Sequence, residues 1–317
     1  MKVTVLDKLS LGLDLPFEIL DEIGEVKFYD ATAQKEVVDH IGDSDVILIN
    51  KVKITESVME KCKNLKLICV FATGFDNIDV VAARKYGVAV CNVPGYSTDS
   101  VALYTIATVL SLVTNLKEYN DYVRCGDYSS SGIPNKIAPV FHELTGKTWG
   151  IIGCGNIGKA VLGIAEVLGA RVIVNKRTPS PEFNCVDIDT LCKESDIITI
   201  HCPLNDSTRG IINKERISLM KKDVILVNEA RGAVLDEKDV ADAVLSGRIG
   251  AFGCDVYSSE PFSCDHPYYK IKDKNNVLLT PHAAWAAYEA RERCLNIILD
   301  NIKSFLSGQT LNRVDLL

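Results

Sequence analysis

The chain has 317 residues, of which 47% are hydrophobic and 24% charged, a composition typical of globular proteins. This length exceeds what one hydrophobic core usually supports and favours two domains. The formal net charge of −7 argues against nucleic-acid and anionic-membrane binding, because both depend on a basic surface.

The 11 cysteines are scattered between Cys62 and Cys294 and include no C-x-x-C pair. Zinc sites and disulfide frameworks need closer or paired spacing, so we expect no metal site. We interpret the cysteines as reduced, mostly buried thiols of a cytoplasmic protein.

Residues 1–7 lack the long apolar region of a signal sequence. The most apolar long run, residues 101–116, contains hydroxyl side chains and falls short of a membrane span, so we expect a buried helix.

Strands and helices alternate in the first hundred residues. Short β-branched runs predict strands at residues 3–6, 26–29, 46–50, 67–71 and 88–91, with helical segments between them at 17–23, 32–41, 55–61 and 78–86. Gly87 is expected to end the last of these helices. Such alternation requires right-handed crossovers and predicts a mostly parallel sheet.

A second unit is expected to begin after Pro94-Gly95-Tyr96-Ser97, where Ser97 can cap the helix over residues 101–116. Residues 128–134 are expected to form a polar loop. Further strands are predicted at residues 148–152, 171–174, 197–201, 224–228, 251–255 and 277–280. The last helix, residues 287–306, is predicted to return to the first domain, because an α/β sheet needs both faces covered.

A glycine-rich turn lies near the middle of the chain. The apolar run 148–152 leads into Gly153-x-Gly155-x-x-Gly158, followed by a helical pattern and a second apolar run at 171–174. In a dinucleotide-binding turn, the first glycine allows the tight turn, the second lets amides approach a pyrophosphate and the third lets the helix pack closely. The helix N-terminus adds unpaired N–H groups and a positive dipole end. Such turns also occur without a ligand, but the surrounding strand–helix–strand pattern favours dinucleotide binding.

Polar side chains that suit catalysis follow three strands of the second unit. His282 comes just after the strand at 277–280, at the edge where open α/β sheets bind ligands. Arg231 can grip a carboxylate with its planar guanidinium. Glu260 can hydrogen-bond a ring nitrogen of His282, fix its tautomer and favour its protonated form. Each residue alone also suits a solvated surface charge, but three on consecutive strand ends favour acid–base chemistry on an acidic substrate.

The other four histidines are interpreted differently. His40 is expected in a polar helix, and His142 and His266 in polar loops, where all three would be solvated. His201 ends a strand and suits a structural or a cofactor-side role.

These motifs, in this order and over essentially the whole chain, resemble the D-isomer-specific 2-hydroxyacid dehydrogenase family. The matching segments are Ala72-Thr73-Gly74-Phe75-Asp76-Asn77-Ile78-Asp79, residues 153–158, His201-Cys202-Pro203-Leu204, residues 227–232 with Asp236, residues 253–261 and residues 280–285. The resemblance implies an α/β fold of two doubly wound parallel-sheet domains. A Rossmann cofactor domain at 99–285 would be inserted into a flavodoxin-like substrate domain at 1–98 and 286–317.

The resemblance also implies the roles of individual residues. Arg231, Glu260 and His282 would form the catalytic group, with the substrate between the domains. Its carboxylate would lie on Arg231 and on amides near Thr73 and Gly74, and His282 would protonate the keto oxygen that hydride transfer leaves. The expected cofactor contacts are Gly153, Gly155, Asn156, Ile157, Gly158, Asn175, Lys176, Arg177, His201, Pro203, Thr208, Ala230 and Asp255.

Three of the expected site residues have a second interpretation. Asp255 is expected to face the nicotinamide amide, but its position also suits a helix N-cap. Tyr96 and Trp285 are expected in the substrate pocket, but aromatic side chains near strand ends also pack in cores.

The choice of cofactor depends on the end of the strand at 171–174. NAD-preferring members of the family carry an acid there, which accepts from the ribose hydroxyls. This chain has Asn175, Lys176, Arg177 and Thr178 instead, and the two cations suit the 2′-phosphate of NADP. We therefore expect NADP, with NAD as the alternative in which both cations are merely solvated.

Residues 93–102 and 281–286 resemble the glycerate dehydrogenase and hydroxypyruvate reductase branch, which implies reduction of hydroxypyruvate or glyoxylate to D-glycerate or glycolate. A D-lactate or aromatic 2-hydroxyacid dehydrogenase is the alternative within the same chemistry. A dinucleotide-sensing, co-repressor-like binding module is the alternative of another class, although the retained catalytic group favours an enzyme.

The family implies a homodimer formed through the cofactor domain, partly by the helix 101–116. Cys154, inside the glycine turn, is either redox-sensitive or an ordinary small residue.

Overall fold

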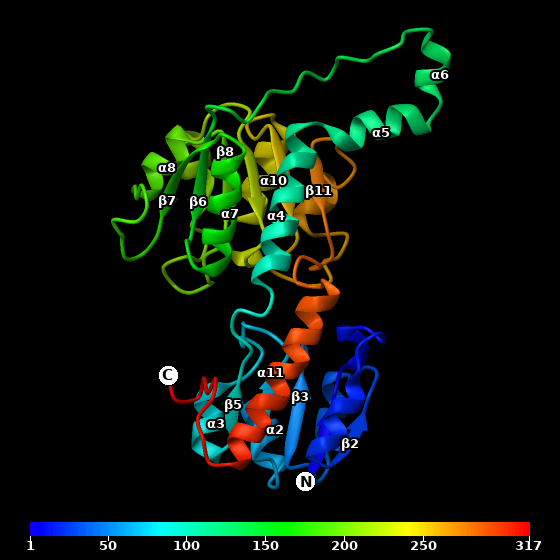
Figure 1. Cartoon of the computed structure of the whole chain (residues 1–317), viewed down its shortest axis with the longest axis vertical. Helices are drawn as coiled ribbons and strands as arrows, with labels where there is room; N and C mark the ends of the chain where they lie inside the picture. The colour runs from blue at the N-terminus through cyan, green and yellow to red at the C-terminus, as the bar shows by residue number, and fades with distance from the viewer. The chain divides into compact units, whose positions relative to one another are not determined.

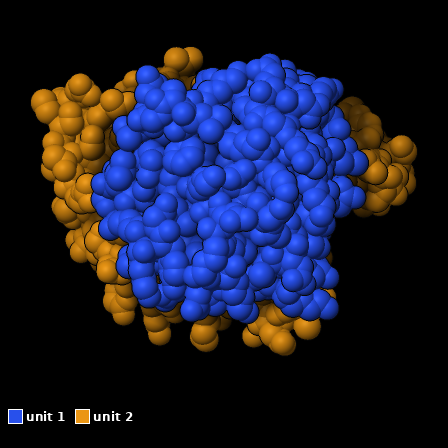
Figure 2. All heavy atoms as spheres, turned by 90° about the horizontal axis from the view of Figure 1, so that it is seen from below, with its two compact units in different colours: residues 1–97, 285–317 blue, residues 98–284 orange.

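The computed structural model describes all 317 residues, which divide into two compact units. Unit 1 comprises Met1–Ser97 and Trp285–Leu317, and unit 2 comprises Thr98–Ala284. Figure 2 shows that the two segments of unit 1, in blue, form one body. The chain therefore leaves unit 1 once, builds unit 2 and returns.

Unit 1 contains one sheet of five parallel strands in the order β2-β1-β3-β4-β5. The strands are Lys2–Val5 (β1), Glu25–Phe28 (β2), Val46–Ile49 (β3), Leu67–Val70 (β4) and Ala89–Cys91 (β5). The helices are Lys8–Leu11 (η1), Phe17–Ile23 (η2), Gln34–Glu36 (η3), Val37–Ile41 (α1), Glu56–Lys61 (α2), Val80–Tyr86 (α3) and Tyr288–Leu306 (α11). This strand order is that of flavodoxin-like folds.

The strands β3, β4 and β5 are buried along their whole length, which explains why they read as apolar runs, whereas the edge strand β2 alternates exposed and half-buried residues. In β3, Leu48 belongs to the apolar cluster formed with η2 and α11, whereas Ile47 and Ile49 belong to the cluster formed with α1, α2 and α3. The last helix, α11, thus packs on a sheet whose strands all lie in the first 91 residues of the chain (Figure 1).

Unit 2 contains one sheet of six parallel strands in the order β11-β10-β9-β8-β6-β7. The strands are Thr148–Ile152 (β6), Arg171–Asn175 (β7), Ile197–Ile200 (β8), Ile225–Asn228 (β9), Ala251–Cys254 (β10) and Val277–Leu279 (β11). The helices are Thr98–Val113 (α4), Leu116–Arg124 (α5), Asp127–Ser131 (α6), Asn156–Val167 (α7), Ile188–Glu194 (α8), Lys214–Leu219 (α9), Gly232–Val234 (η4), Glu237–Leu245 (α10) and Pro267–Lys270 (η5). The strand order reverses between β6 and β8, and doubly wound sheets bind ligands at the carboxyl ends of the strands beside such a point.

Helices cover both faces of this second sheet as well. In β6, Ile151 packs in the cluster that contains α4 and α7, and Ile152 packs in the cluster that contains α8, α9 and α10. Two parallel-sheet α/β domains are thus present, and the predicted fold class is confirmed.

Several predicted elements differ in their bounds. The helix expected over 101–116 is α4, which begins at Thr98 and ends at Val113, because Asn115 adopts a left-handed conformation (φ 52°) before α5 begins. The expectation of a loop at 128–134 is wrong for its first half, since α6 extends to Ser131. The helix expected over 17–23 is the 3₁₀ helix η2, and the one expected over 32–41 is the short 3₁₀ helix η3 followed by the α-helix α1.

No single helix has the length and apolar composition to cross a membrane; α4 and α5 meet those criteria only as a pair, and the chain bends by 65° between them. All 11 cysteines are free and most are buried, as the sequence predicted.

Candidate active site

The glycine turn after β6 leaves an open approach to the first turn of α7. Gly153 has a left-handed φ of 89°, and a Cβ there would lie 2.5 Å from the backbone nitrogen of Cys202. A Cβ on Gly158 would lie 2.2 Å from the Gly153 carbonyl oxygen, so the helix packs directly on the turn. Above Gly155, by contrast, a Cβ would meet nothing within 4 Å. Asn156 begins α7, so its first N–H groups border this open space and suit a phosphate.

His201 follows β8, on the strand next to β6. Its carbonyl carbon would be 2.8 Å from a Cβ on Gly153, so it lies directly beside the glycine turn. Both ring nitrogens are buried without a hydrogen-bond partner, and burial lowers the pKa of the imidazole to about 3. Unpartnered buried polar atoms are rare, so the His201 ring is an unusual feature of the residue that lies beside the glycine turn.

The other predicted cofactor residues after β8 are engaged in their own loop. The Thr208 hydroxyl donates to the Pro203 carbonyl at 2.6 Å and accepts from the Asn205 N–H at 2.8 Å. This hydroxyl therefore stabilises the loop beside His201.

The end of β7 carries the two predicted cations. The Asn175 side-chain amide donates to the Val186 carbonyl at 3.1 Å, and the Lys176 ammonium lies 5.1 Å from the centre of the Phe183 ring. Arg177 is exposed. The strand end thus presents positive charge beside the glycine turn.

Within the turn, burial raises the pKa of the Cys154 thiol, which disfavours the reactive thiolate and favours the interpretation of Cys154 as an ordinary small residue.

Arg231, Glu260 and His282 follow the neighbouring strands β9, β10 and β11. His282 Nδ1 lies 2.6 Å from Glu260 Oε2, so the hydrogen bond predicted from the sequence is present. The carboxylate accepts, so Nδ1 carries the hydrogen and Nε2 is the nitrogen that can exchange a proton with a substrate. The side chains of His282 and Glu260 are 23% and 27% exposed, which leaves the pair accessible.

The loop that carries His282 is held by Asp255, at the end of β10. Asp255 is 1% exposed, and its carboxylate accepts from the Thr280 hydroxyl at 2.6 Å and from the N–H groups of Ala283 and Ala284 at 2.8 Å each. His282 itself has a left-handed φ of 55° and donates its N–H to the Asp255 carbonyl at 2.8 Å. The alternative interpretation of Asp255 as a helix N-cap is therefore wrong, because its carboxylate oxygens accept hydrogen bonds from the 280–284 loop and not from the first turn of a helix.

Arg231 lies one residue after Ala230, whose carbonyl accepts from the Arg231 guanidinium at 2.9 Å. The Asn228 amide binds both residues, accepting from the Ala230 N–H at 3.1 Å and donating to the Arg231 carbonyl at 3.0 Å. The side chain of Arg231 is thereby held at the carboxyl end of β9.

A buried acid that the sequence analysis missed lies one residue before Ala230. Glu229 is 8% exposed; its Oε1 accepts from the Thr108 hydroxyl at 3.3 Å and its Oε2 has no partner. Burial, reinforced by Asp255, raises its pKa to about 8, so this group is protonated at neutral pH. The available signal was its place directly after an apolar strand, two residues before Arg231.

Two histidines expected in solvent are partly or fully buried. His266 is buried, and its Nε2 lies 2.9 Å from Glu237 Oε2. His40 stacks on Tyr29 with ring centres 3.6 Å apart and lies 2.9 Å from the Thr32 hydroxyl. The predictions of solvated side chains were wrong because the packing partners come from other elements. His142 is exposed, as predicted.

The remaining predicted substrate residues belong to unit 1. Thr73 and Gly74 follow β4, and Thr73 is held by a hydrogen bond from its hydroxyl to the Val93 carbonyl at 2.9 Å. Tyr96 is buried, and its ring centre lies 6.3 Å from that of Trp285, which packs against the same core. Tyr96 is therefore a residue of the unit 1 core, which is the second of the two interpretations given above.

Comparison with known proteins places these features in a family. Residues 106–284 match the model of the D-isomer specific 2-hydroxyacid dehydrogenase NAD binding domain. A hydroxypyruvate reductase from Blautia hydrogenotrophica is 39% identical over 99% of this chain and 100% of its own. An acyclic imino acid reductase in complex with NADPH and D-Arg has a TM-score of 0.88 at 30% identity, over 99% of this chain and 100% of that one. D-lactate dehydrogenase from Aquifex aeolicus, complexed with NAD and lactic acid, has a TM-score of 0.86 at 30% identity, over 97% and 96%.

Proposed function

Because this chain belongs to the D-isomer-specific 2-hydroxyacid dehydrogenase family, we propose that it reduces small 2-keto acids to D-2-hydroxy acids with a nicotinamide dinucleotide. Hydroxypyruvate and glyoxylate are the proposed preferred substrates. The observation that carries the proposal is the 2.6 Å hydrogen bond between His282 and Glu260 on adjacent strand ends of the dinucleotide-binding unit.

In this mechanism the chain supplies charge, orientation and a proton. A bound nicotinamide dinucleotide supplies the hydride. His282 holds a proton at Nε2 while Glu260 accepts the hydrogen bond from Nδ1 and stabilises the protonated ring until the proton moves to the substrate oxygen. Arg231 binds the substrate carboxylate through its planar guanidinium. In the reverse direction, neutral His282 accepts the proton of the hydroxy acid.

We assign the dinucleotide to unit 2 and part of the substrate carboxylate contact to Thr73 and Gly74 of unit 1. The open space above Gly155, the N-terminus of α7 and the unpartnered ring of His201 support the first assignment. The position of Thr73 and Gly74 directly after β4 supports the second.

NADP is the proposed preferred dinucleotide. The end of β7 carries Lys176 and Arg177 where an NAD-preferring protein carries an acid. The NADPH complex of the imino acid reductase also supports this choice, whereas the NAD complex of the D-lactate dehydrogenase supports the alternative.

The experiment that tests this function is a steady-state assay of NADPH and NADH oxidation with hydroxypyruvate, glyoxylate, pyruvate and phenylpyruvate. A clear preference in kcat/KM for hydroxypyruvate or glyoxylate is expected. Preference for pyruvate or phenylpyruvate would shift the assignment to a D-lactate or aromatic 2-hydroxyacid dehydrogenase. No oxidation with any of the four would contradict the enzyme and favour the binding module.

We also propose a homodimer formed through unit 2. Helices α5 and α6 and the chain that follows α6 extend from the rest of unit 2 (Figure 1), and no residue of α5 is buried. Large apolar side chains are exposed along this arm, at Leu116, Val123, Ile133, Ile137, Val140 and Phe141. Large apolar side chains that are exposed together on one segment favour a protein–protein interface. Light scattering should give a dimer for the wild type and a monomer for Ile137→Asp with Val140→Asp; a wild-type monomer would contradict the proposal.

A further inference from the structure

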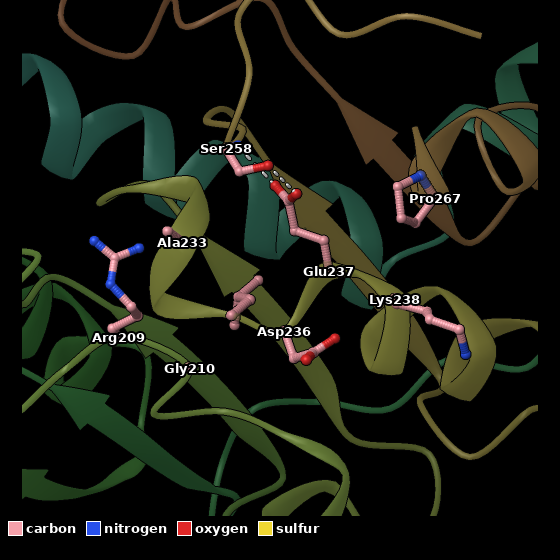
Figure 3. Close-up of a pocket in the computed structure, with 9 residues that line it drawn as sticks. Arg209, Gly210, Ala233, Asp236, Glu237, Lys238, Ser258 and Pro267 are labelled. Carbon is pink, nitrogen blue, oxygen red and sulfur yellow. Dashed lines mark hydrogen bonds between the residues drawn. The ribbon is translucent and has the colours of Figure 1, made fainter. Parts of the chain in front are cut away.

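A buried carboxylate lies behind the loop that carries Glu260. Glu237 is the first residue of α10 and borders a surface cavity of about 350 Å³. Figure 3 shows that Glu237 points toward Ser258, whereas the neighbouring Asp236 and Lys238 side chains point away from it. The Glu237 side chain is only 9% exposed, so it is not a solvated charge of the kind that α10 carries elsewhere.

Glu237 is the common acceptor of a closed network. Its carboxylate accepts from the Ser258 N–H at 2.8 Å, from the Ser258 hydroxyl and, at 2.9 Å, from Nε2 of His266. Nδ1 of His266 accepts from the Tyr268 N–H at 3.2 Å, so Nε2 is the nitrogen that carries hydrogen toward Glu237. The His266 side chain is 7% exposed, and in such a dry setting hydrogen bonds to a carboxylate are strong.

The loop held by Glu237 is the one that aims Glu260. A Cβ on Gly232 would lie 2.2 Å from the Ser258 nitrogen, so Gly232 of η4 packs directly against the Tyr257–Ser258 peptide. The Tyr257 N–H donates to Glu260 Oε1 at 2.9 Å, and Glu260 Oε2 binds His282 Nδ1 at 2.6 Å. Any shift of Ser258 therefore moves the adjoining residue Tyr257, whose N–H is hydrogen-bonded to the Glu260 carboxylate.

We propose that Glu237 and His266 are positioning residues of the reaction: by holding Ser258 they fix the turn that aims Glu260 at His282. This inference rests on the proposed 2-keto acid reductase function. Neither residue follows the β6 or β7 strand ends assigned to the dinucleotide, so their loss should act on turnover and leave dinucleotide binding intact.

Other titratable groups face this network from the neighbouring strands. Cys254, Tyr257 and Tyr268 interact electrostatically with Glu237 or Glu260; burial raises the pKa of each further above its ordinary value, so all three are neutral near pH 7. Asp255 and the buried Glu229 lie at the ends of β10 and β9. The hydrogen bonds of Asp255 go to the 280–284 loop and that of Glu229 to Thr108, so the contacts described for these two acids do not include Ser258.

The test is Glu237→Gln, which keeps the shape but has only one accepting oxygen, whereas the Ser258 N–H binds Oε1 of Glu237 and His266 binds Oε2. We expect kcat for the best 2-keto acid to fall about 10- to 100-fold, because a misplacement of about 1 Å has that effect on catalysis. The alkaline limb of the kcat/KM profile should move down by about one pH unit, because Glu260 stabilises protonated His282 less well. The Kd of NADPH, measured by fluorescence, should stay within about twofold of wild type, and His266→Phe should act in the same direction.

The matched control is Asp236→Ala, one residue away on the same helix. Asp236 caps α10 by accepting from the Asp239 N–H at 3.0 Å, and in Figure 3 it points away from Ser258. This variant should lower Tm while leaving kcat and the pH profile unchanged. Wild-type kcat and pH profile in Glu237→Gln, or an equal loss of kcat in Asp236→Ala, would overturn the inference.

A second readout separates this inference from the proposed function. If the wild type reduces no 2-keto acid, the function fails, and the positioning role is tested by NMR titration of the His282 ring in ¹⁵N-labelled protein. A lower titration midpoint in Glu237→Gln than in the wild type supports the role. Equal midpoints overturn it.

Discussion

His282 Nδ1 and Glu260 Oε2 lie 2.6 Å apart, although 22 positions separate the two residues in the chain. The parallel strands β10 and β11 bring them together, because both strands end at the same edge of the unit 2 sheet. Asp255 then holds the His282 loop, and the Tyr257 N–H holds the second oxygen of Glu260. The pair is thus oriented from both sides by groups that do not themselves need to move during proton transfer.

His282→Ala should reduce kcat for 2-keto acid reduction by about 10²- to 10⁴-fold, the usual contribution of a general acid. The Kd of NADPH should stay near that of the wild type, because the glycine turn is untouched. His142→Ala is the control, since His142 is exposed and lies outside the site. Turnover close to wild type in His282→Ala would remove the acid–base role.

Changing Lys176 and Arg177 together to Gln should weaken NADPH binding by about tenfold or more and leave NADH binding unchanged. The reason is that only NADPH carries the 2′-phosphate, and a hydrogen bond to a charged group contributes about 1.5–3 kcal/mol. Isothermal titration with each dinucleotide measures the effect. Lys272→Gln with Lys274→Gln removes the same charge elsewhere and controls for net charge. An equal loss for both dinucleotides would count against phosphate recognition.

Gly155→Ala should weaken dinucleotide binding, whereas Gly158→Ala should lower the stability of the fold. The new methyl group at 155 meets no protein atom within 4 Å, so we expect an unchanged Tm and weaker dinucleotide binding. At 158 it would lie 2.2 Å from the Gly153 carbonyl oxygen, so we expect a loss of about 1–3 kcal/mol in the free energy of unfolding. Calorimetry and fluorescence titration separate the two outcomes; full dinucleotide affinity in Gly155→Ala would contradict the assignment of the turn.

Glu229 should make stability depend on pH. Burial raises its pKa from 4.5 to about 8, so the folded protein keeps a proton that the unfolded chain releases within that window. Stability is therefore fully present below about pH 4.5 and falls as pH rises toward 8, by roughly 1 kcal/mol per pH unit from this group. Urea unfolding over this range should show a shallower fall in Glu229→Gln. Glu215→Gln, an exposed acid on α9, should keep the wild-type slope, and equal slopes in all three proteins would contradict the prediction.

Many features of this protein follow from local sequence patterns. The strand and helix order, the glycine turn at 153–158 and the polar residues after β9, β10 and β11 could all be recognised from the sequence, because periodicity and turn chemistry act over a few residues. The carboxyl ends of parallel strands meet at one edge, so the pairing of Glu260 with His282 could be predicted as well.

Other features depend on which segments pack together. His266 looked like a loop residue in solvent, and only the fold places it against Glu237, 29 positions earlier. Nothing in the local sequence showed that Glu229 is buried; the fold places it against Thr108 of α4, and burial, reinforced by Asp255, raises its pKa. The sequence by itself determined the order of elements and the polar residues that follow the strand ends of unit 2. The tertiary structure alone decided which side chains lose water and which loop is held in place, because burial and hydrogen-bond partners come from residues far apart in the chain.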